Sequence, residues 1–191
     1  RRSSDLEVGS LPYNISTPLL VLLLQHLPQI GDMHFMLQRE VAERLAAEPG
    51  TKDWGRLTVL MQYHCVIENL FDVAPESFTP PPRVWSAVIR ITPRSAKPDV
   101  DAAALDTVLR HAFSQRRKRL ANALQSLQID WTASGVDQGK RADAISVDEY
   151  IALAHALVSA PADGTVSEPA DSGRGARRHR GERRDQQERQ A

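Results

Sequence analysis

The sequence predicts an α/β fold that is followed by a small all-helical domain. Between residues 6 and 91, short stretches with strand-like alternation are interleaved with stretches of helical periodicity, which is typical of α/β layers. Beyond residue 99 the apolar spacing is helical only, and the stretch from Pro93 to Asp99 has the composition of a linker. Hydrophobic residues make up 41% of the chain, which is enough for a packed core.

The first predicted helix is the most apolar. Ser16 or Thr17 caps its start, and Pro18 occupies a first-turn position where a missing N–H costs little. The run from Leu19 to Leu24 is apolar on every side, so we expect this helix to be buried all round. Pro28 is expected to end it.

The other elements of the first part alternate along the chain. Strands are expected at residues 6–9, 33–37, 66–73 and 84–91, and helices at residues 39–47 and 55–64. In the second strand, one face holds Met33, Phe35 and Leu37. The helix of residues 55–64 should bury a single side, formed by Leu57, Leu60, Met61 and His64.

Three apolar helical faces are expected in the second part. They are Leu105, Val108, Leu109, Ala112 and Phe113; Leu120, Leu124 and Leu127; and Tyr150, Ile151, Ala154, Leu157 and Val158. Ser146 and Glu149 form a capping-box signature before the third face. Residues 161–191 have almost no apolar side chains, so they are expected to form a disordered, basic tail.

Composition narrows the class of protein. The chain has a single cysteine, Cys65, so an internal disulfide is excluded, which fits the reducing cytoplasm. We expect Cys65 to be a small buried side chain. The longest apolar run is far shorter than the roughly 20 residues that a membrane span needs, and the six histidines show no metal-ligand spacing. We therefore expect no membrane segment and no metal. The formal net charge is zero, but Arg116, Arg117, Lys118 and Arg119 form a local basic patch that can bind RNA.

The most informative run is Val8-Gly9-Ser10-Leu11-Pro12-Tyr13-Asn14. Ser10 can accept a hydrogen bond through its hydroxyl, and Pro12 stiffens the turn because its φ is fixed and it has no N–H. Tyr13 offers a ring on which a base can stack. Together these residues are suited to gripping a flat base that carries an amino group.

The chain resembles the ribosomal RNA adenine dimethyltransferases, the KsgA family. The segments that carry the resemblance, in the family's order and spacing, are LPYNISTPLL, DMHFMLQREVAERL, GRLTVLMQY and FTPPPRVWSAVIR, with FSQRRKRLANAL matching the family's helical domain. The resemblance implies that residues 1–94 are the C-terminal half of a Rossmann-like S-adenosylmethionine-dependent methyltransferase domain. Residues 98–160 would be a small helical domain on the RNA side. The family's glycine-rich cofactor loop lies upstream of the LPY motif, so an N-terminally truncated chain is expected.

The resemblance also implies an activity and a site. The full version would dimethylate N6 of two adjacent adenosines in small-subunit (16S) ribosomal RNA during ribosome biogenesis, with S-adenosylmethionine as methyl donor. The catalytic motif corresponds to Ser10, Leu11, Pro12 and Tyr13. Ser10 stands where the family has Asn, and it would also border the cofactor.

Further contacts are implied for the substrate. Tyr13 and Phe78 would stack on the target base, and RNA would be held by Arg56, Arg116, Arg117, Lys118 and Arg119. Each residue also has a simpler reading. Ser10 can merely end a strand, the two rings can simply pack, and charge runs are usually solvated surface.

Two alternative functions fit parts of the sequence. One is a noncatalytic ribosomal-RNA-binding or ribosome-assembly remnant, which the lack of the main cofactor loop favours. The other is a DNA adenine methyltransferase, against which the helical domain and the FTPPPRV run argue. In the leading interpretation, the protein is a monomeric cytoplasmic enzyme whose partner is the pre-30S particle.

Overall fold

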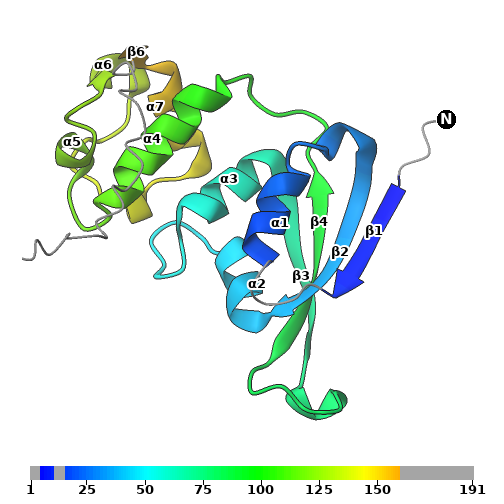
Figure 1. Cartoon of the computed structure of the whole chain (residues 1–191). Helices are drawn as coiled ribbons and strands as arrows, with labels where there is room; N and C mark the ends of the chain where they lie inside the picture. The colour runs from blue at the N-terminus through cyan, green and yellow to red at the C-terminus, as the bar shows by residue number, and fades with distance from the viewer. Residues whose placement is uncertain (1–4, 11–15, 160–191) are drawn as a thin grey trace, which may run out of the picture. The chain divides into compact units, whose positions relative to one another are not determined.

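The computed structural model describes residues 5–10 and 16–159 of the 191-residue chain (Figure 1). The first part contains β1 (Asp5–Ser10), α1 (Ser16–Leu23), η1 (Leu27–Gln29), β2 (Ile30–Gln38), α2 (Arg39–Leu45), α3 (Arg56–His64), β3 (Cys65–Val73), η2 (Pro75–Ser77) and β4 (Ser86–Pro93). The second part contains α4 (Ala102–Ser114), α5 (Leu120–Ala123), β5 (Gln128–Ile129), α6 (Trp131–Ser134), η3 (Ala142–Ala144), α7 (Val147–His155) and β6 (Leu157–Ser159). The predicted tail of residues 161–191 lies outside the described residues.

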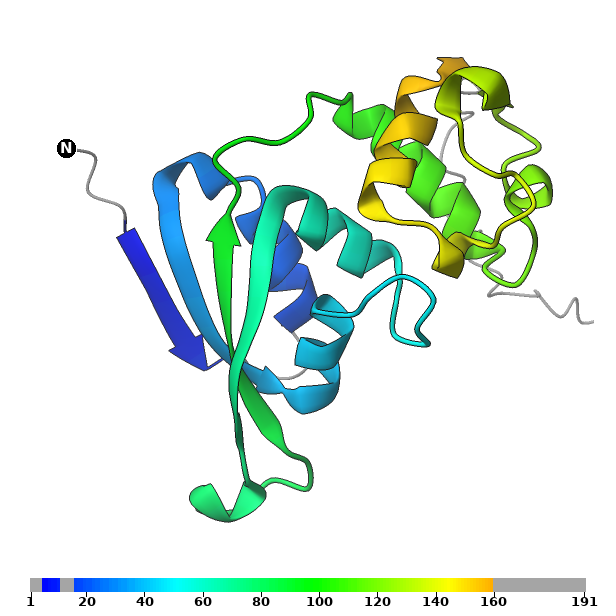
Figure 2. The ribbon, with the colours of Figure 1, turned by 180° about the vertical axis from the view of Figure 1, so that it is seen from behind.

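A four-stranded mixed sheet organises the first part. The strand order is β1-β2-β4-β3, with β1 and β2 parallel and the other two pairs antiparallel. Helices α1, α2 and α3 lie on one face of this sheet, and the β3–β4 hairpin continues beyond it (Figures 1 and 2). The α/β class predicted from the sequence is confirmed, and so is the face of β2, because Met33, Phe35 and Leu37 are all buried.

Helix α1 is less buried than its apolar sequence predicts. Leu20 is 1% exposed, but Val21 and Leu22 are 38% and 50% exposed. The prediction of burial all round is wrong because the helix packs one side against the sheet and the described part of the chain leaves the other side open. The helix also ends at Leu23, and Pro28 lies inside the short η1 turn.

Helix α3 is buried on two sides. Met61 belongs to the hydrophobic cluster under the sheet, whereas Val59 and Tyr63 belong to the cluster of the helical region. The single predicted side is therefore wrong in part, since Leu60 and His64 are only half-buried. Apolar spacing identifies a single apolar face of a helix, whereas α3 has two apolar faces that pack into two different cores.

The helical region is built around the predicted faces. The predicted residues of α4 from Leu105 to Ala112 are buried. The predicted second helix is much shorter than its pattern, because α5 has only four residues, although Leu120, Leu124 and Leu127 are all buried. The capping box before α7 is confirmed, with Ser146 accepting a hydrogen bond from the Glu149 N–H.

Two short strands were not predicted in this region. Helix α7 ends at His155, and Val158 lies in β6, where its side chain is 71% exposed. Strand β6 pairs with β5, which has only two residues. Strands this short show no measurable periodicity, so the sequence pattern extends the helix through them.

The single cysteine behaves as predicted. Cys65 starts β3, is fully buried, and its thiol is free. Burial raises its pKa to about 11, so the thiol stays protonated and unreactive at neutral pH. Among the helices in the described ranges, none is both long and apolar enough to cross a membrane.

Candidate functional site

The backbone of Ser10 lies at one end of the sheet. Ser10 is the last residue of β1, and its Cα pairs with Met36 in β2. Met36 pairs in turn with Val88 in β4, and Val88 pairs with Phe71 in β3, so these four residues form one row across the sheet. The side chain of Ser10, together with Leu11, Pro12 and Tyr13, lies outside the described residues.

The segment that carries Phe78 leaves the sheet at the same end. Gln38 at the end of β2 pairs with Ser86 at the start of β4, and Val73 at the end of β3 pairs with the same Ser86. Residues 74–85 therefore extend from the edge at which β1 stops. Phe78 follows η2 in this segment and is half-exposed. The fold thus brings the backbone of Ser10 and the segment that carries Phe78 to a common end of the sheet.

Arg56 has an intramolecular partner. It is the first residue of α3, and its guanidinium pairs with the carboxylate of Asp106 on α4. Both side chains are about half-exposed, so the pair ties the two helices at the surface. An RNA contact through Arg56 stays a prediction.

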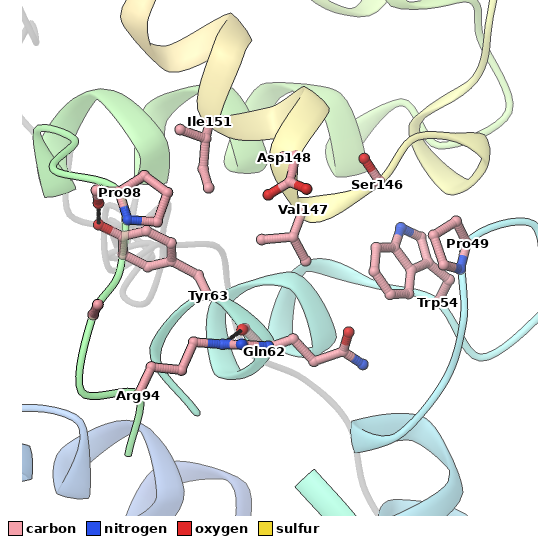
Figure 3. A pocket seen from close by; sticks show the side chains of 11 residues that line it. Pro49, Trp54, Gln62, Tyr63, Arg94, Pro98, Ser146, Val147, Asp148 and Ile151 are labelled. Carbon is pink, nitrogen blue, oxygen red and sulfur yellow. Dashed lines mark hydrogen bonds between the residues drawn. The ribbon is translucent and has the colours of Figure 1, made fainter. Parts of the chain in front are cut away.

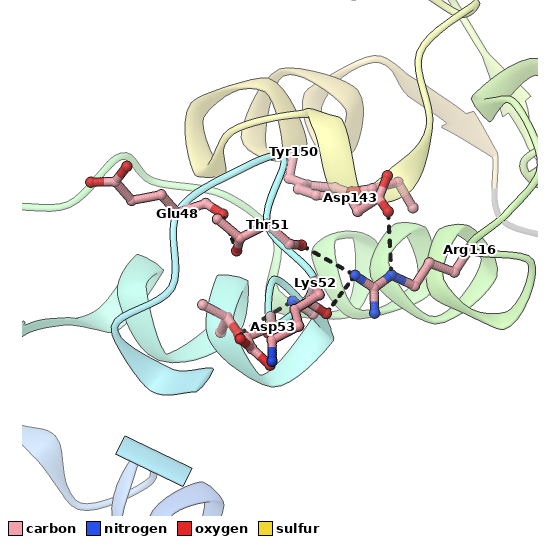
Figure 4. A network of polar contacts seen from close by, with 10 residues as sticks. Glu48, Thr51, Lys52, Asp53, Arg116, Asp143 and Tyr150 are labelled. Atoms are coloured by element: carbon pink, nitrogen blue, oxygen red, sulfur yellow. Dashed lines mark hydrogen bonds and ion pairs between the residues drawn. The ribbon is translucent and has the colours of Figure 1, made fainter. Parts of the chain in front are cut away.

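The guanidinium of Arg116 makes several contacts within the chain, which the charge pattern of the sequence does not predict (Figure 4). Its Nη2 donates to the backbone oxygens of Lys52 at 2.7 Å and Thr51 at 3.3 Å. Its Nε lies 3.5 Å from a carboxylate oxygen of Asp143, and the backbone oxygen of Asp143 accepts from the Gly50 N–H at 2.6 Å. The guanidinium therefore joins the loop after α2 to the helical region.

The next three basic residues differ from Arg116. Arg117, Lys118 and Arg119 are exposed, and within residues 5–10 and 16–159 no carboxylate pairs with them. They lie in the turn between α4 and α5, where the Lys118 N–H donates to the Gln115 oxygen at 2.8 Å, and Arg119 caps the start of α5. A surface cavity of about 360 Å³, lined by residues 113–118, adjoins this turn. We name Arg117, Lys118 and Arg119 the basic loop.

The fold adds one cation that sequence reasoning missed. Arg141 forms an isolated antiparallel bridge with Arg119, and its side chain is exposed. The neighbouring backbone supports this pairing, because the oxygen of Lys140 accepts from the Leu120 N–H at 2.8 Å. Arg141 stands beside Lys140, 22 positions after Arg119 and outside the run of residues 116–119, so the sequence holds no signal for its proximity to Arg119.

A second cavity lies away from the end of the sheet that holds Ser10. It measures about 350 Å³ and lies between α3, the start of α7 and the segment after β4 (Figure 3). Arg94 lines it and follows the end of β4 that is opposite to Ser86. The Tyr63 hydroxyl donates to the Pro98 oxygen at 2.8 Å across one wall. The residues that line this cavity include neither Ser10 nor Phe78.

The described residues do not make a complete cofactor site. No glycine-rich turn follows a strand in residues 5–10 and 16–159, and of the predicted cofactor contacts only the backbone of Ser10 is described. In the same ranges, no three His, Cys, Asp or Glu side chains gather closely enough to hold a metal ion.

Comparison with known proteins decides the family. The ribosomal RNA adenine dimethylase family matches residues 6–158. The chain belongs to this family. It is 51% identical over 158 residues to "Ribosomal RNA small subunit methyltransferase A" of Pseudomonas aeruginosa, and 51% identical over 161 residues to the protein of that name from Burkholderia mallei. These alignments cover 81% and 82% of the chain but 59% and 58% of the relatives, so the chain spans less than two thirds of the length of these relatives.

Solved structures agree with the dimethylase fold. A dimethyladenosine transferase from Plasmodium falciparum superimposes with a TM-score of 0.68 at 25% identity, covering 78% of this chain and 66% of that one. The 23S rRNA methyltransferase ErmE superimposes with a TM-score of 0.59 at 22% identity, covering 82% of this chain and 66% of that one, and shares the fold. The mixed sheet described above is thus the second part of a Rossmann-like methyltransferase domain.

Proposed function

We propose that this chain serves the S-adenosylmethionine-dependent dimethylation of N6 of two adjacent adenosines in small-subunit ribosomal RNA. The observation that carries the proposal is the position of the LPY motif. It follows the C-terminal end of β1, in a chain that belongs to the ribosomal RNA adenine dimethylase family over residues 6–158. Active sites of open α/β sheets lie beyond the carboxyl ends of their parallel strands, which is where this motif begins.

The proposed chemistry rests on acceptors. The lone pair of an adenine amino group is delocalised into the ring, so hydrogen-bond acceptors that take its hydrogens favour its localisation on nitrogen. Ser10 and the carbonyl of Pro12 would be these acceptors, and Tyr13 with Phe78 would hold the flipped base between rings. S-Adenosylmethionine would supply the methyl group, and the contribution of this chain would be positioning and acceptor placement.

The basic loop would hold the RNA. Arg117, Lys118, Arg119 and the adjacent Arg141 present exposed guanidinium and ammonium groups, which suit phosphate oxygens. Arg116 would act on RNA indirectly, because its contacts to Thr51 and Lys52 fix the start of this loop. The pre-30S particle is the proposed partner and the cytoplasm the proposed compartment of a protein that acts as a monomer.

The test measures transfer of labelled methyl groups to unmethylated small subunits by the complete gene product that contains this chain. Tyr13→Ala is expected to abolish transfer while the affinity for S-adenosylmethionine changes little, because the ring would contact only the base. Ser10→Asn is expected to keep or raise transfer, since an amide oxygen reaches farther than a hydroxyl.

Two outcomes would contradict the proposal. Equal losses of transfer and cofactor affinity in Tyr13→Ala would show that the ring supports the fold or the cofactor and does not stack on the base. Tight RNA binding by the wild-type protein without any transfer would instead favour a ribosomal-RNA-binding assembly factor.

A further inference from the structure

An exposed tryptophan lies at the start of β4. The side chain of Trp85 is 47% exposed, whereas Trp54 is 1% exposed and Trp131 is half-buried. Trp85 follows Arg83 and Val84, which are also exposed, so three consecutive side chains are open to solvent just before the strand begins. A tryptophan with half of its surface in water gives up much of the free energy that its burial would supply, which suggests a surface used for binding.

The register of the sheet fixes where Trp85 lies. Its backbone oxygen accepts a hydrogen bond from the Arg39 N–H at 2.9 Å, directly beyond the Gln38–Ser86 pair. Val88 lies in the row that contains Ser10, two strands away, which is about 10 Å at ordinary strand spacing. Trp85 is three residues from Val88, so it extends about 10 Å past that row, beyond the end of the sheet at which β1 stops.

The charges around Trp85 favour an anionic, flat partner. Arg83 is exposed, and no carboxylate pairs with it in the described part of the chain. Two carboxylates of the adjoining elements are already engaged, because Glu43 and Asp72 both pair with Arg39, at 2.8 and 3.5 Å, whereas Glu76 in η2 is exposed. An aromatic ring beside an unpaired guanidinium is the combination that single-stranded RNA-binding surfaces use.

We propose that Trp85 stacks on an unpaired nucleotide that neighbours the target adenosine, while Arg83 contacts the adjoining phosphate. This inference rests on the proposed function, since it assumes that RNA approaches the end of the sheet where β1 stops. Stacking on Trp85 would hold the strand on one side of the target base, and the basic loop would hold a separate stretch of phosphates. Stacking on Trp85 would not depend on the RNA sequence, because every base has a π face.

The experiment uses the full chain with two RNA probes. One probe is a single-stranded oligoadenylate of about 12 nucleotides, and the other is a ribose-phosphate oligomer of equal length without bases. Trp85→Leu is expected to weaken oligoadenylate binding about fivefold or more while affinity for the abasic oligomer stays within about twofold. Trp85→Tyr should retain most of the binding. Oligoadenylate should quench the tryptophan emission of Trp131→Phe, which keeps the exposed Trp85 and the buried Trp54, but not the emission of Trp131→Phe combined with Trp85→Tyr.

Val84→Ala provides the matched control, because Val84 is 42% exposed on the same segment but cannot stack. Equal losses in Val84→Ala and Trp85→Leu would overturn the inference and indicate an apolar protein contact. Equal losses on both oligomers, or no loss, would also overturn it. If the wild-type chain binds neither oligomer, the proposed function fails as well; if it binds and Trp85→Leu changes nothing, only the role of Trp85 fails.

Discussion

Replacing Arg116 with alanine should weaken the fold more than it weakens contact with RNA. Arg116 and Arg117 are adjacent in the sequence and identical in charge, yet only Arg116 is bonded within the described chain. The substitution leaves the backbone oxygens of Thr51 and Lys52 without their charged donor. It also leaves the carboxylate of Asp143 without its cation.

The size of the effect follows from the contacts that are lost. A hydrogen bond to a charged group contributes about 1.5–3 kcal/mol, and the short 2.7 Å contact to Lys52 belongs to this class. The 3.3 Å contact to Thr51 and the 3.5 Å ion pair to Asp143 are weaker, and the side chain is 38% exposed, so solvent screens both. We expect Arg116→Ala to lower the free energy of unfolding by about 2 kcal/mol.

Urea unfolding and salt-dependent RNA binding separate the two roles. Arg117→Ala is the matched control, and it should change the free energy of unfolding by less than about 0.5 kcal/mol because its side chain contacts no described partner. It should also reduce the slope of log affinity against log salt concentration by about 0.7–0.9, as expected for one lost phosphate contact. An Arg116→Ala protein of unchanged stability, with its salt slope reduced as much as in Arg117→Ala, would show that Arg116 binds RNA directly and does not support the fold.

Two further predictions concern titration and buried polarity. Burial and the nearby charge of Lys97 lower the pKa of His64 to about 4. The free energy of unfolding should therefore be highest above about pH 6.5 and fall by about 1–2 kcal/mol toward pH 4. Urea titrations of His64→Gln should show a flatter pH profile, and an unchanged profile would contradict this. Tyr150→Phe should cost about 1–2 kcal/mol in the same assay, because its buried hydroxyl donates to the Ala142 oxygen at 2.7 Å; a neutral change would show that this oxygen finds another donor.

The elements with a strong single period could be predicted from the sequence. Met33, Phe35 and Leu37 alternate along β2, and the capping box at Ser146 marks the start of α7; the structure confirms both. These features depend on neighbours within one element, so local chemistry is enough to identify them. Helix α3 could be predicted only in part, because Val59 packs into a second core that the periodicity of the helix does not indicate.

The candidate site also has one part that could be predicted from the sequence and one part that could not. The motif around Ser10 is visible in the sequence because its chemistry is contained in four consecutive residues. The distinction between Arg116 and Arg117 is invisible, because it depends on backbone oxygens about 65 positions away. Arg141 is likewise found only through its bridge to Arg119. Sequence reasoning locates the chemical groups, and tertiary contacts decide which of them are free to bind.

The region of the sheet and the helical region are joined by contacts at several separate points. Helix α3 is buried by the sheet cluster through Met61 and by the helical cluster through Val59. The Arg56–Asp106 pair and the contacts of Arg116 join the same two regions at separate points. These contacts act in addition to the covalent link of residues 94–101, and each of them is absent from the linear sequence pattern because its partners lie far apart along the chain.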